Sequence, residues 1–167
     1  MRKLLYVIVI LFTIHCSLFT ISCSTIDCPV ENTVAVHYEI RDKAGKELAI
    51  TDSLSIVSTR QDGNYVVLNR LSNKSSFSIP ISYAYPEDVL YFCFKYLEND
   101  SIVVDTVCIK KDDFPHFESV DCNASFFHEI TDVQYTRHYI DSLVLLNKSV
   151  TYDQTTVHFR LVPKGSN

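Results

Sequence analysis

The clearest indication of the fold is a hairpin sequence, VLYFCFKYLENDSIVVDTVCIK, at residues 89–110. Two runs rich in β-branched and aromatic residues, which favour strands, flank a polar segment that ends in Asp100-Ser101. A two-residue turn at Asp100-Ser101 joins the runs as antiparallel strands and sets Phe94 opposite Val107 on one face. Apolar pairs on that face predict a sheet with one side packed against a core.

Comparable runs recur along the chain, separated by turn signals about every 8–12 residues, and no segment has a convincing helical period. This is the pattern of an antiparallel β-sandwich, and we expect an all-β domain of about eight strands. Pro80 marks an edge strand or a bend, and the charged stretch 111–115 is expected to be a loop. The predicted strands are 33–40, 54–59, 65–69, 76–83, 89–97, 102–110, 125–130, 138–147 and 155–162.

The composition argues against several classes of protein. With three glycines in 167 residues, the chain offers little material for a glycine-rich phosphate loop. It carries 15 Lys+Arg against 20 Asp+Glu, and removal of Arg2 and Lys3 with a signal peptide leaves 13 against 20. An acidic domain with no basic run is a poor candidate for binding nucleic acid or an anionic membrane surface.

The first 23 residues have the organisation of an export signal. Arg2 and Lys3 precede an apolar run over residues 4–21, and the segment closes on Thr20-Ile21-Ser22-Cys23. These last four residues resemble the lipobox of bacterial lipoproteins, although Thr20 stands where leucine is usual. In that family a diacylglycerol is joined to the cysteine sulfur and the signal is cut just before it, which implies lipid attachment at Cys23.

Two other interpretations of this segment stay open. About 18 apolar residues can span a bilayer as an uncleaved anchor, and plain secretion is the other possibility. A polar interruption at residues 15–17, and the lack of a basic cluster after the run, weigh against an anchor. Because residues 24–27 lack the acidic cluster associated with export to the surface, we expect an outer-membrane protein that faces the periplasm, with surface exposure left open. The lipoprotein interpretation divides the chain into a signal peptide (1–22), a lipid-anchored linker (23–32), a β-sandwich domain (33–163) and a C-terminal tail (164–167).

Four cysteines follow Cys23 and suggest two disulfides, with three possible connectivities. The hairpin register sets Cys93 opposite Cys108, and directly opposed residues have Cβ atoms about 4.5–5.5 Å apart, close to bridging distance. The same register makes this a hydrogen-bonded pair, in which the Cα atoms are farther apart. The first choice is a Cys93–Cys108 disulfide, which leaves Cys28 with Cys122. No C-x2-C pair occurs, so we expect no zinc site.

The sequence lacks the G-x-S-x-G, H-E-x-x-H, P-loop and dinucleotide-binding patterns. We therefore expect no catalytic residues, no metal and no cofactor. Histidines with neighbouring carboxylates occur in the second half, but their spacing matches no ligand pattern and is typical of the solvated face of a sheet. These residues are His116, His128 and His138, with Asp121, Glu129, Asp132 and Asp141.

One short pattern exceeds its background frequency. Asp followed by Ser or Thr and then by an apolar residue occurs four times, where this composition predicts about one occurrence. The tripeptide resembles the O-glycosylation motif of exported Bacteroidetes proteins, and a polar pair that simply opens a strand is the other interpretation. The candidate acceptors are Ser53, Ser101, Thr106 and Ser142.

Three segments of the second half carry a family resemblance: SVDC (119–122), TRHYIDS (136–142) and VHFRL (157–161). In these segments the chain is similar to an uncharacterised family of small Bacteroidetes envelope lipoproteins, a domain of unknown function. The similarity extends more loosely back to Cys28. The resemblance implies an Ig-like sandwich on the cell envelope and supplies no catalytic residues.

These observations favour a non-enzymatic envelope lipoprotein whose sandwich binds or scaffolds another envelope component. A glycan-binding accessory protein is one alternative, with Tyr83 and Tyr85 as stacking faces, although the chain has no Trp. A subunit of a surface fibre or adhesin, joined by strand addition at an open sheet edge, is another. The expected partners are the membrane, through lipid on Cys23, and another envelope protein or a glycan, with no nucleic acid.

Overall fold

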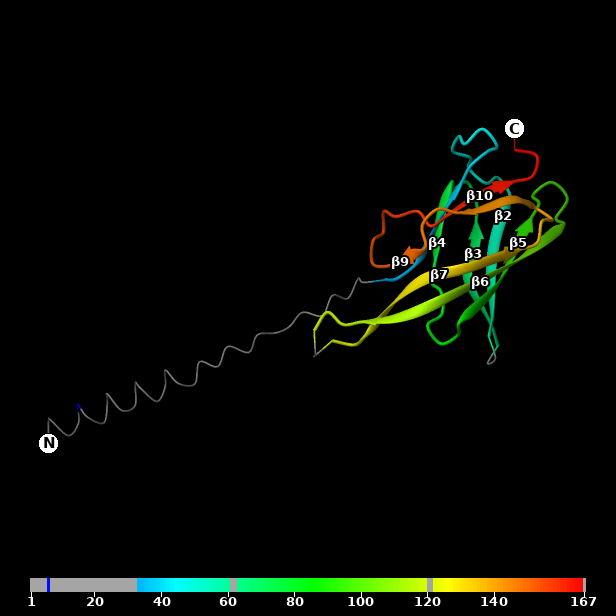
Figure 1. The fold of residues 1–167 in the computed structure, drawn as a ribbon. Helices are drawn as coiled ribbons and strands as arrows, with labels where there is room; N and C mark the ends of the chain where they lie inside the picture. The colour runs from blue at the N-terminus through cyan, green and yellow to red at the C-terminus, as the bar shows by residue number, and fades with distance from the viewer. Residues whose placement is uncertain (1–5, 7–32, 61–62, 120–121, 167) are drawn as a thin grey trace.

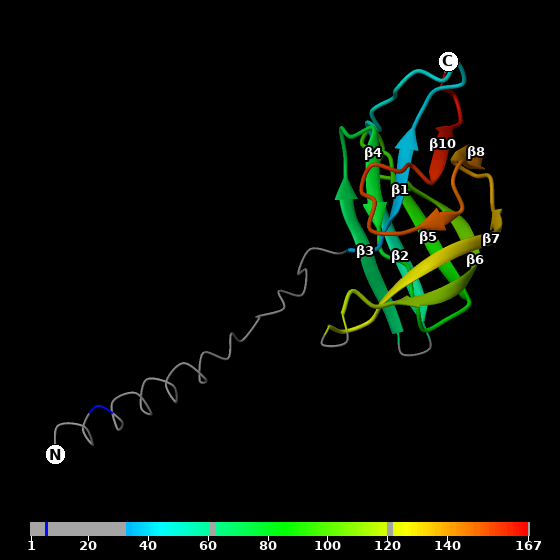
Figure 2. The ribbon, with the colours of Figure 1, turned by 60° about the vertical axis from the view of Figure 1, so that its left-hand side comes forward.

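The computed structural model describes Tyr6 and residues 33–60, 63–119 and 122–166. From residue 33 onward the described chain forms two packed β-sheets and no helix, which confirms the predicted sandwich (Figure 1, Figure 2). No helix among the described residues is both long and apolar enough to cross a bilayer. The strands are β1 (Val36–Ile40), β2 (Ser53–Arg60), β3 (Gly63–Leu71), β4 (Ser76–Ile79), β5 (Glu87–Lys95), β6 (Ile102–His116), β7 (Ser125–Tyr135), β8 (Ile140–Leu145), β9 (Ser149–Val150) and β10 (Phe159–Pro163).

One sheet has four strands in the order β4-β1-β10-β8, and the other has six in the order β3-β2-β5-β6-β7-β9. Paired strands are antiparallel except β1 and β10, which run parallel with Tyr38 beside Phe159. The sequence predicts about eight antiparallel strands, whereas the described chain has ten and this one parallel pair. β4 is an edge strand that ends at Ile79, directly before Pro80, as a residue without an N–H requires.

The core between the sheets is rich in aromatic rings. Tyr38 is 1% exposed and stacks on Phe77 and Phe159, with ring centroids 4.6 and 5.0 Å apart. Phe92 of the opposite sheet meets Tyr38 edge-on at 5.9 Å. Burying a large aromatic side chain removes about 150–250 Å² from water, worth at most about 4–6 kcal/mol, so these rings are a main source of adhesion between the sheets.

The hairpin of β5 and β6 has a longer turn than the sequence predicts. Lys95 pairs with Ile102, so residues 96–101 form the turn, in which Tyr96 N donates to Ser101 O at 2.9 Å. Asp100 has a φ of 63°, a left-handed conformation that aspartate tolerates better than most residues. The two-residue turn at Asp100-Ser101 is therefore wrong.

The longer turn changes the register at both cysteines. Cys93 lies opposite Val104 and Cys108 lies opposite Val89, and both cysteines are free thiols. The predicted Cys93–Cys108 disulfide is therefore wrong. The partner of Cys93 moves by four residues, from 108 to 104, and an even shift leaves every side chain on its predicted face.

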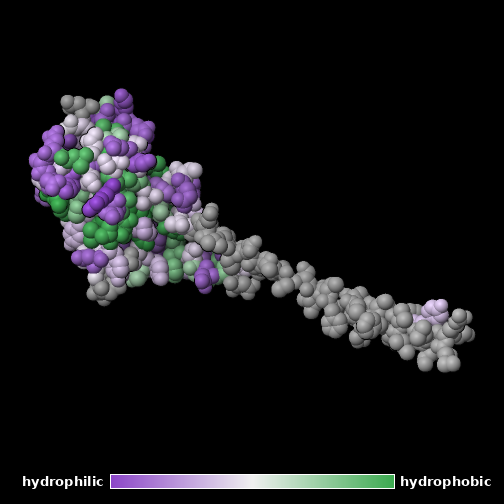
Figure 3. Space-filling view, turned by 180° about the vertical axis from the view of Figure 1, so that it is seen from behind, coloured by the Kyte–Doolittle hydropathy of each residue, from purple (hydrophilic) through white to green (hydrophobic). Residues whose placement is uncertain are grey.

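Both free thiols lie on the outer face of the six-stranded sheet, among partly exposed valines. Seen from behind, the molecule shows hydrophobic side chains gathered in the middle of this face, with hydrophilic ones around them (Figure 3). Burial raises the pKa of Cys93 and of Cys108, which favours the unreactive thiol over the thiolate. The neighbouring valines are Val57, Val66, Val89 and Val104.

β6 continues past the predicted strand end to His116 and pairs with β7 along this extension, so residues 111–115 form a strand and not a loop. A register shift between Lys110 and Lys111 marks a β-bulge, which bends the pair. In Figure 1 the far ends of β6 and β7 project from the body of the sandwich.

Candidate functional site

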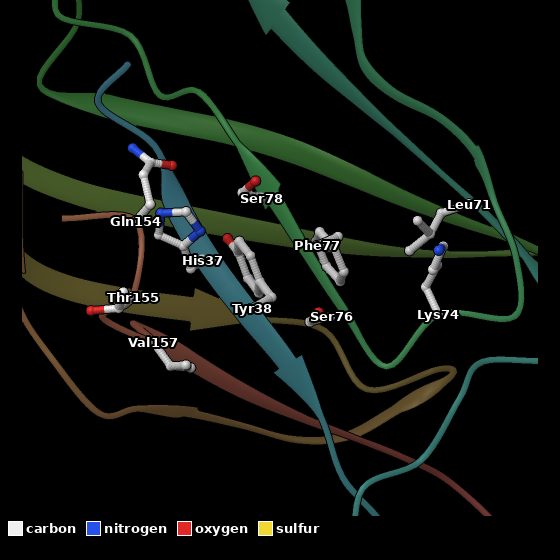
Figure 4. Close-up of a pocket in the computed structure, with 10 residues that line it drawn as sticks. All are labelled: His37, Tyr38, Leu71, Lys74, Ser76, Phe77, Ser78, Gln154, Thr155 and Val157. Carbon is white, nitrogen blue, oxygen red and sulfur yellow. The ribbon is translucent and has the colours of Figure 1, made fainter. Parts of the chain in front are cut away.

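A groove of about 470 Å³ lies on the outer face of the four-stranded sheet, where β1 and the edge strand β4 meet the loop before β10 (Figure 4). The strands contribute residues whose side chains alternate outward, such as His37 of β1 and Ser78 of β4. The lining residues are His37, Tyr38, Leu71, Lys74, Ser76, Phe77, Ser78, Gln154, Thr155 and Val157.

The loop beside the groove is held by its own side chains. Asp153 accepts hydrogen bonds from the backbone N (2.8 Å) and the hydroxyl (2.6 Å) of Thr155. Hydrogen bonds of this kind favour the ionised carboxylate and hold the pKa of Asp153 well below its ordinary value. Gln154 donates to the carbonyl oxygens of Thr33 (2.7 Å) and Tyr152 (3.2 Å), which ties the loop to the start of the sandwich.

His37 of β1 lines the groove, and His158, directly before β10, packs against it. His158 Nδ1 accepts the backbone N–H of His37 (3.0 Å), so Nε2 of His158 carries the proton and donates to Ser149 O (3.1 Å). The two rings stack with centroids 5.5 Å apart. Burial lowers the pKa of both histidines, which favours their neutral forms. Within the described chain, Nε2 of His37 is buried without a hydrogen-bond partner, so a bound group could satisfy it.

β4 has a described neighbour on one side only, which is β1. Ile40 N donates to Ser75 O at 2.7 Å, and this bond fixes which pairs of the antiparallel ladder are hydrogen-bonded. By the same alternation, the backbone N–H and C=O groups of Ser76 and Ser78 point away from β1, toward the open edge. The site therefore places backbone donors and acceptors next to a groove lined by both polar and apolar residues, a geometry suited to an extended peptide.

A second group of ionisable residues is buried inside the sandwich. The Lys111 side chain is fully buried, with Nζ 3.2 Å from Asp88 Oδ2 and 3.6 Å from Asp113 Oδ1. Lys111 Nζ also donates to the carbonyl of Tyr85. Asp113 Oδ1 lies 2.5 Å from Nδ1 of His128, whose pKa is lowered by burial. The network joins β5, β6 and β7, and the prediction that His128 lies on a solvated face is wrong.

A third group holds the crossing from β7 to β8, where the chain passes from one sheet to the other. Asp105 is fully buried, and its Oδ1 accepts hydrogen bonds from Thr136 Oγ1 (2.8 Å) and His138 N (2.6 Å). Its Oδ2 accepts from the backbone N of Tyr139 and of Ile140, both at 2.8 Å. Burial alone would raise the pKa of Asp105, but these hydrogen bonds outweigh it and hold the pKa below its ordinary value.

The four candidate glycosylation sites differ in exposure. Ser101 is exposed in the β5–β6 turn, whereas Ser53, Thr106 and Ser142 are half-buried. Thr106 lies within β6 and directly follows Asp105. Asp105 holds the crossing between the sheets, and this structural role explains an aspartate before Thr106 without a glycosylation motif. Exposure thus favours Ser101 as an acceptor, and glycosylation at each of the four sites stays a prediction.

The described histidines and carboxylates noted in the sequence do not converge on one site, and Asp121 lies outside the described residues. His116 lies 3.3 Å from Glu118 at the far end of β6, whereas His138 lies 3.2 Å from Asp105 near its beginning. Within the described residues no group of three or more His, Cys, Asp or Glu is placed to hold a metal ion.

Of the remaining predicted site residues, Cys122, Tyr83 and Tyr85 are described by the structure. Cys122 is disulfide-bonded, but Cys28, its predicted partner, and Cys23, the predicted lipid site, lie outside the described residues. Both assignments therefore stay predictions. Tyr83 is exposed, as a stacking residue would be, whereas Tyr85 is half-buried.

Sequence reasoning missed the groove and the Lys111 network, because both are assembled from strands far apart in the chain. Comparison with curated proteins gave no match, and neither did comparison with solved structures. One family model, described as a family of unknown function (DUF6452), matches residues 53–163. The match runs from β2 to β10 and includes Asp105 and Lys111, but it does not reach back to Cys28. It covers more than half of the chain, so this protein belongs to the DUF6452 family, whose function is unknown.

Proposed function

We propose that this protein is a cell-envelope lipoprotein that binds an extended segment of another envelope protein beside β4, and that it does not catalyse a reaction. The observation that carries the binding role is the open edge, where Ser76 and Ser78 direct backbone groups outward next to the groove. Strand addition takes its affinity from such backbone groups and its specificity from neighbouring pockets.

The groove indicates the class of partner. Among the described lining residues Lys74 is the one permanently charged side chain, and hydroxyl and amide groups supply most of the remaining polar atoms. A partner strand that alternates small polar and apolar side chains matches this lining, and one of its hydrogen-bonding groups could reach His37 Nε2. Scaffolding and fibre assembly are both forms of the same contact, because each joins an extended segment to an open edge.

Support for the anchor comes from the sequence. A basic start, an apolar run and the Thr20–Cys23 segment match the bacterial lipoprotein signal, and the second half resembles Bacteroidetes envelope lipoproteins. Lipid on Cys23 would hold the sandwich at the outer membrane, on the periplasmic side. The residues between Cys23 and Thr33 would then form a short tether between the bilayer and the domain.

The role of the buried ionisable groups supports binding over catalysis. Asp105 holds the crossing between the sheets, Lys111 lies between two carboxylates, and His158 is fixed by two backbone groups. Each of these side chains stabilises neighbouring parts of the fold, and none of the three lines the groove.

A photo-crosslinking residue at Ser78, in the full chain expressed in its native cells, tests this proposal. We expect a discrete adduct with an envelope protein, and the same residue at Val144 on β8, the opposite edge of the sheet, serves as the matched control. A Ser76→Pro substitution removes one outward N–H without touching the ladder to β1. Loss of that hydrogen bond, worth about 1 kcal/mol, should reduce the Ser78 adduct about fivefold.

Equal adducts at Ser78 and Val144, or an adduct that Ser76→Pro leaves unchanged, would contradict strand addition at β4. A thermal unfolding curve of the Ser76→Pro variant checks that the sandwich is intact. Turnover of a substrate by the purified chain in a broad hydrolase screen would contradict the non-enzymatic assignment.

A further inference from the structure

Aromatic side chains are exposed at the end of the sandwich where β6 leads into β7. Phe114 is 53% exposed, Phe117 is 63% exposed and Tyr83 of the neighbouring loop is 64% exposed. Phe114 lies opposite Phe127 on one face of the β6–β7 pair, whereas Tyr83 stacks on Phe126, which points to the other face. Single exposed apolar residues are common on soluble domains, but large rings on both faces of one projecting end favour an interaction. We call the residues Tyr83, Phe114, Phe117, Phe126 and Phe127 the aromatic end.

The rings of the aromatic end are held by neighbours. Tyr83 stacks on Phe126, with centroids 4.6 Å apart and ring planes within 9°. Phe127 stacks on His116 at 4.3 Å, and Tyr152 meets the Phe127 ring edge-on at 4.8 Å. Side chains fixed in this way lose little conformational entropy when they bind, so Tyr83, Phe126 and Phe127 are preorganised.

The described chain also enters the sandwich at this end. Gln154 donates to Thr33 O (2.7 Å) and to Tyr152 O (3.2 Å), and the Tyr152 ring packs against Phe127. Figures 1 and 2 show the start of β1 and the far ends of β6 and β7 on the same side of the molecule. The ten residues from Cys23 to Asn32 reach at most about 35 Å when fully extended, so lipid on Cys23 would keep the bilayer close to the aromatic end.

We propose that the aromatic end contacts the bilayer to which the lipid on Cys23 attaches, and this inference rests on the proposed anchor. Aromatic rings prefer the membrane–water interface, where their apolar faces leave water near the headgroups. On the β6, β7 and β9 segments at this end, the carboxylates of Asp112, Glu118 and Glu129 outnumber the cation of Lys148, and this net negative charge opposes binding to anionic lipids. The occupant is therefore a zwitterionic phospholipid surface. Such a contact orients β6 toward the membrane and places Ile102, at the opposite end of this 15-residue strand, up to about 45 Å farther out.

Tryptophan fluorescence tests the contact, because the natural chain has no Trp. Phe117→Trp introduces a single reporter at the aromatic end, and Ile102→Trp is its matched control, since the native side chains are 63% and 61% exposed. The full lipidated chain is incorporated into zwitterionic phosphatidylcholine vesicles that contain brominated acyl chains. We expect the bromine atoms to quench the Phe117→Trp reporter at least twofold more than the Ile102→Trp reporter.

Flotation of the vesicles separates failure of the contact from failure of the anchor. Flotation with equal quenching of the two reporters would overturn the membrane contact alone, whereas a chain that does not float would overturn the anchor and the contact together. Protection of the Phe117→Trp reporter from soluble acrylamide by added glycans, without quenching by brominated lipid, would overturn the contact in favour of glycan binding. A Phe114→Trp variant repeats the measurement at an independent position if the Phe117→Trp chain does not fold.

Discussion

Replacement of Asp105 by asparagine perturbs the crossing between the two sheets with almost no change in side-chain volume. In the native chain Oδ2 of Asp105 accepts the N–H groups of Tyr139 and Ile140, and Oδ1 accepts from Thr136 and His138. In Asp105→Asn an NH₂ group replaces either Oδ1 or Oδ2, and this group cannot accept the hydrogen bonds of the two donors that face it. Two buried donors then lose their acceptor, at about 1–3 kcal/mol each, so we expect a loss of about 4 kcal/mol in the free energy of unfolding.

For a domain of this size, about 1 kcal/mol corresponds to a shift of about 3–4 °C, so Asp105→Asn should lower the melting temperature by about 12–16 °C. Urea unfolding followed by circular dichroism gives the free energy directly. Asp100→Asn is the matched control, because Asp100 lies exposed in a turn and its ion pair with Lys95 is solvated. We expect that control to change stability by less than about 0.5 kcal/mol.

The pH dependence provides a second test of the same carboxylate. The folded-state pKa of Asp105 is depressed, so its contribution is present above the unfolded pKa of about 3.9 and is lost as pH falls through the folded pKa. The stability difference between the native chain and Asp105→Asn should therefore shrink below about pH 4. A loss under about 1 kcal/mol at pH 7, or a loss equal to that of Asp100→Asn, would refute the claim that this carboxylate holds the crossing.

Three further predictions concern buried or free side chains. Lys111→Met leaves the carboxylates of Asp88 and Asp113 without their cation, and it should reduce the free energy of unfolding in urea by about 3–5 kcal/mol. Lys110 is half-exposed, so the control Lys110→Met should cost less than about 0.5 kcal/mol. Equal effects of the two substitutions would contradict the network. Burial lowers the pKa of His158, so the free energy of unfolding should fall as pH drops below about 6.5, where the unfolded histidine binds a proton. In chemical unfolding, His158→Asn should reduce the dependence of this free energy on pH between about pH 7 and pH 5. An unchanged pH dependence would contradict the role of His158. Alkylation of the unfolded, unreduced chain should label both Cys93 and Cys108 in peptide mass spectrometry, and a peptide pair joined through these two residues would reverse the assignment.

Much of the fold could be predicted because apolar residues alternate along the strands. Val36, Tyr38 and Ile40 share the buried face of β1, as a period of two requires. Pro80 correctly marks an edge, because a residue without an N–H cannot continue an interior ladder. These signals are local, and each depends on residues close together in the chain.

The register of the β5–β6 hairpin could not be predicted from the same alternation. A two-residue and a six-residue turn place the same side chains on the same faces, so the core pattern fits both. The left-handed conformation of Asp100, which the sequence does not specify, accompanies the longer turn. The error changed which residues lie opposite one another: Cys93 meets Val104 and not Cys108, and Phe94 meets Val103 and not the predicted Val107.

The Lys111 network and the groove could not be predicted for a different reason. Lys111 continues the inward alternation of Val107 and Ile109, but its charge predicts an exposed position in a loop. It can be buried in a strand because the carboxylate of Asp88, on β5, is its partner. The groove likewise depends on contacts such as the one between His37 and His158, which are 121 residues apart. Such contacts follow from the topology of the sheets and have no signal in a local stretch of sequence.

Intact-protein mass spectrometry of the chain purified from its native cells tests the anchor, on which both proposals depend. We expect the mass of residues 23–167 with a diacylglycerol and any further acyl chain on Cys23, and tandem spectra that place the lipid on the first residue. An unmodified chain that keeps residues 1–22 would contradict the account.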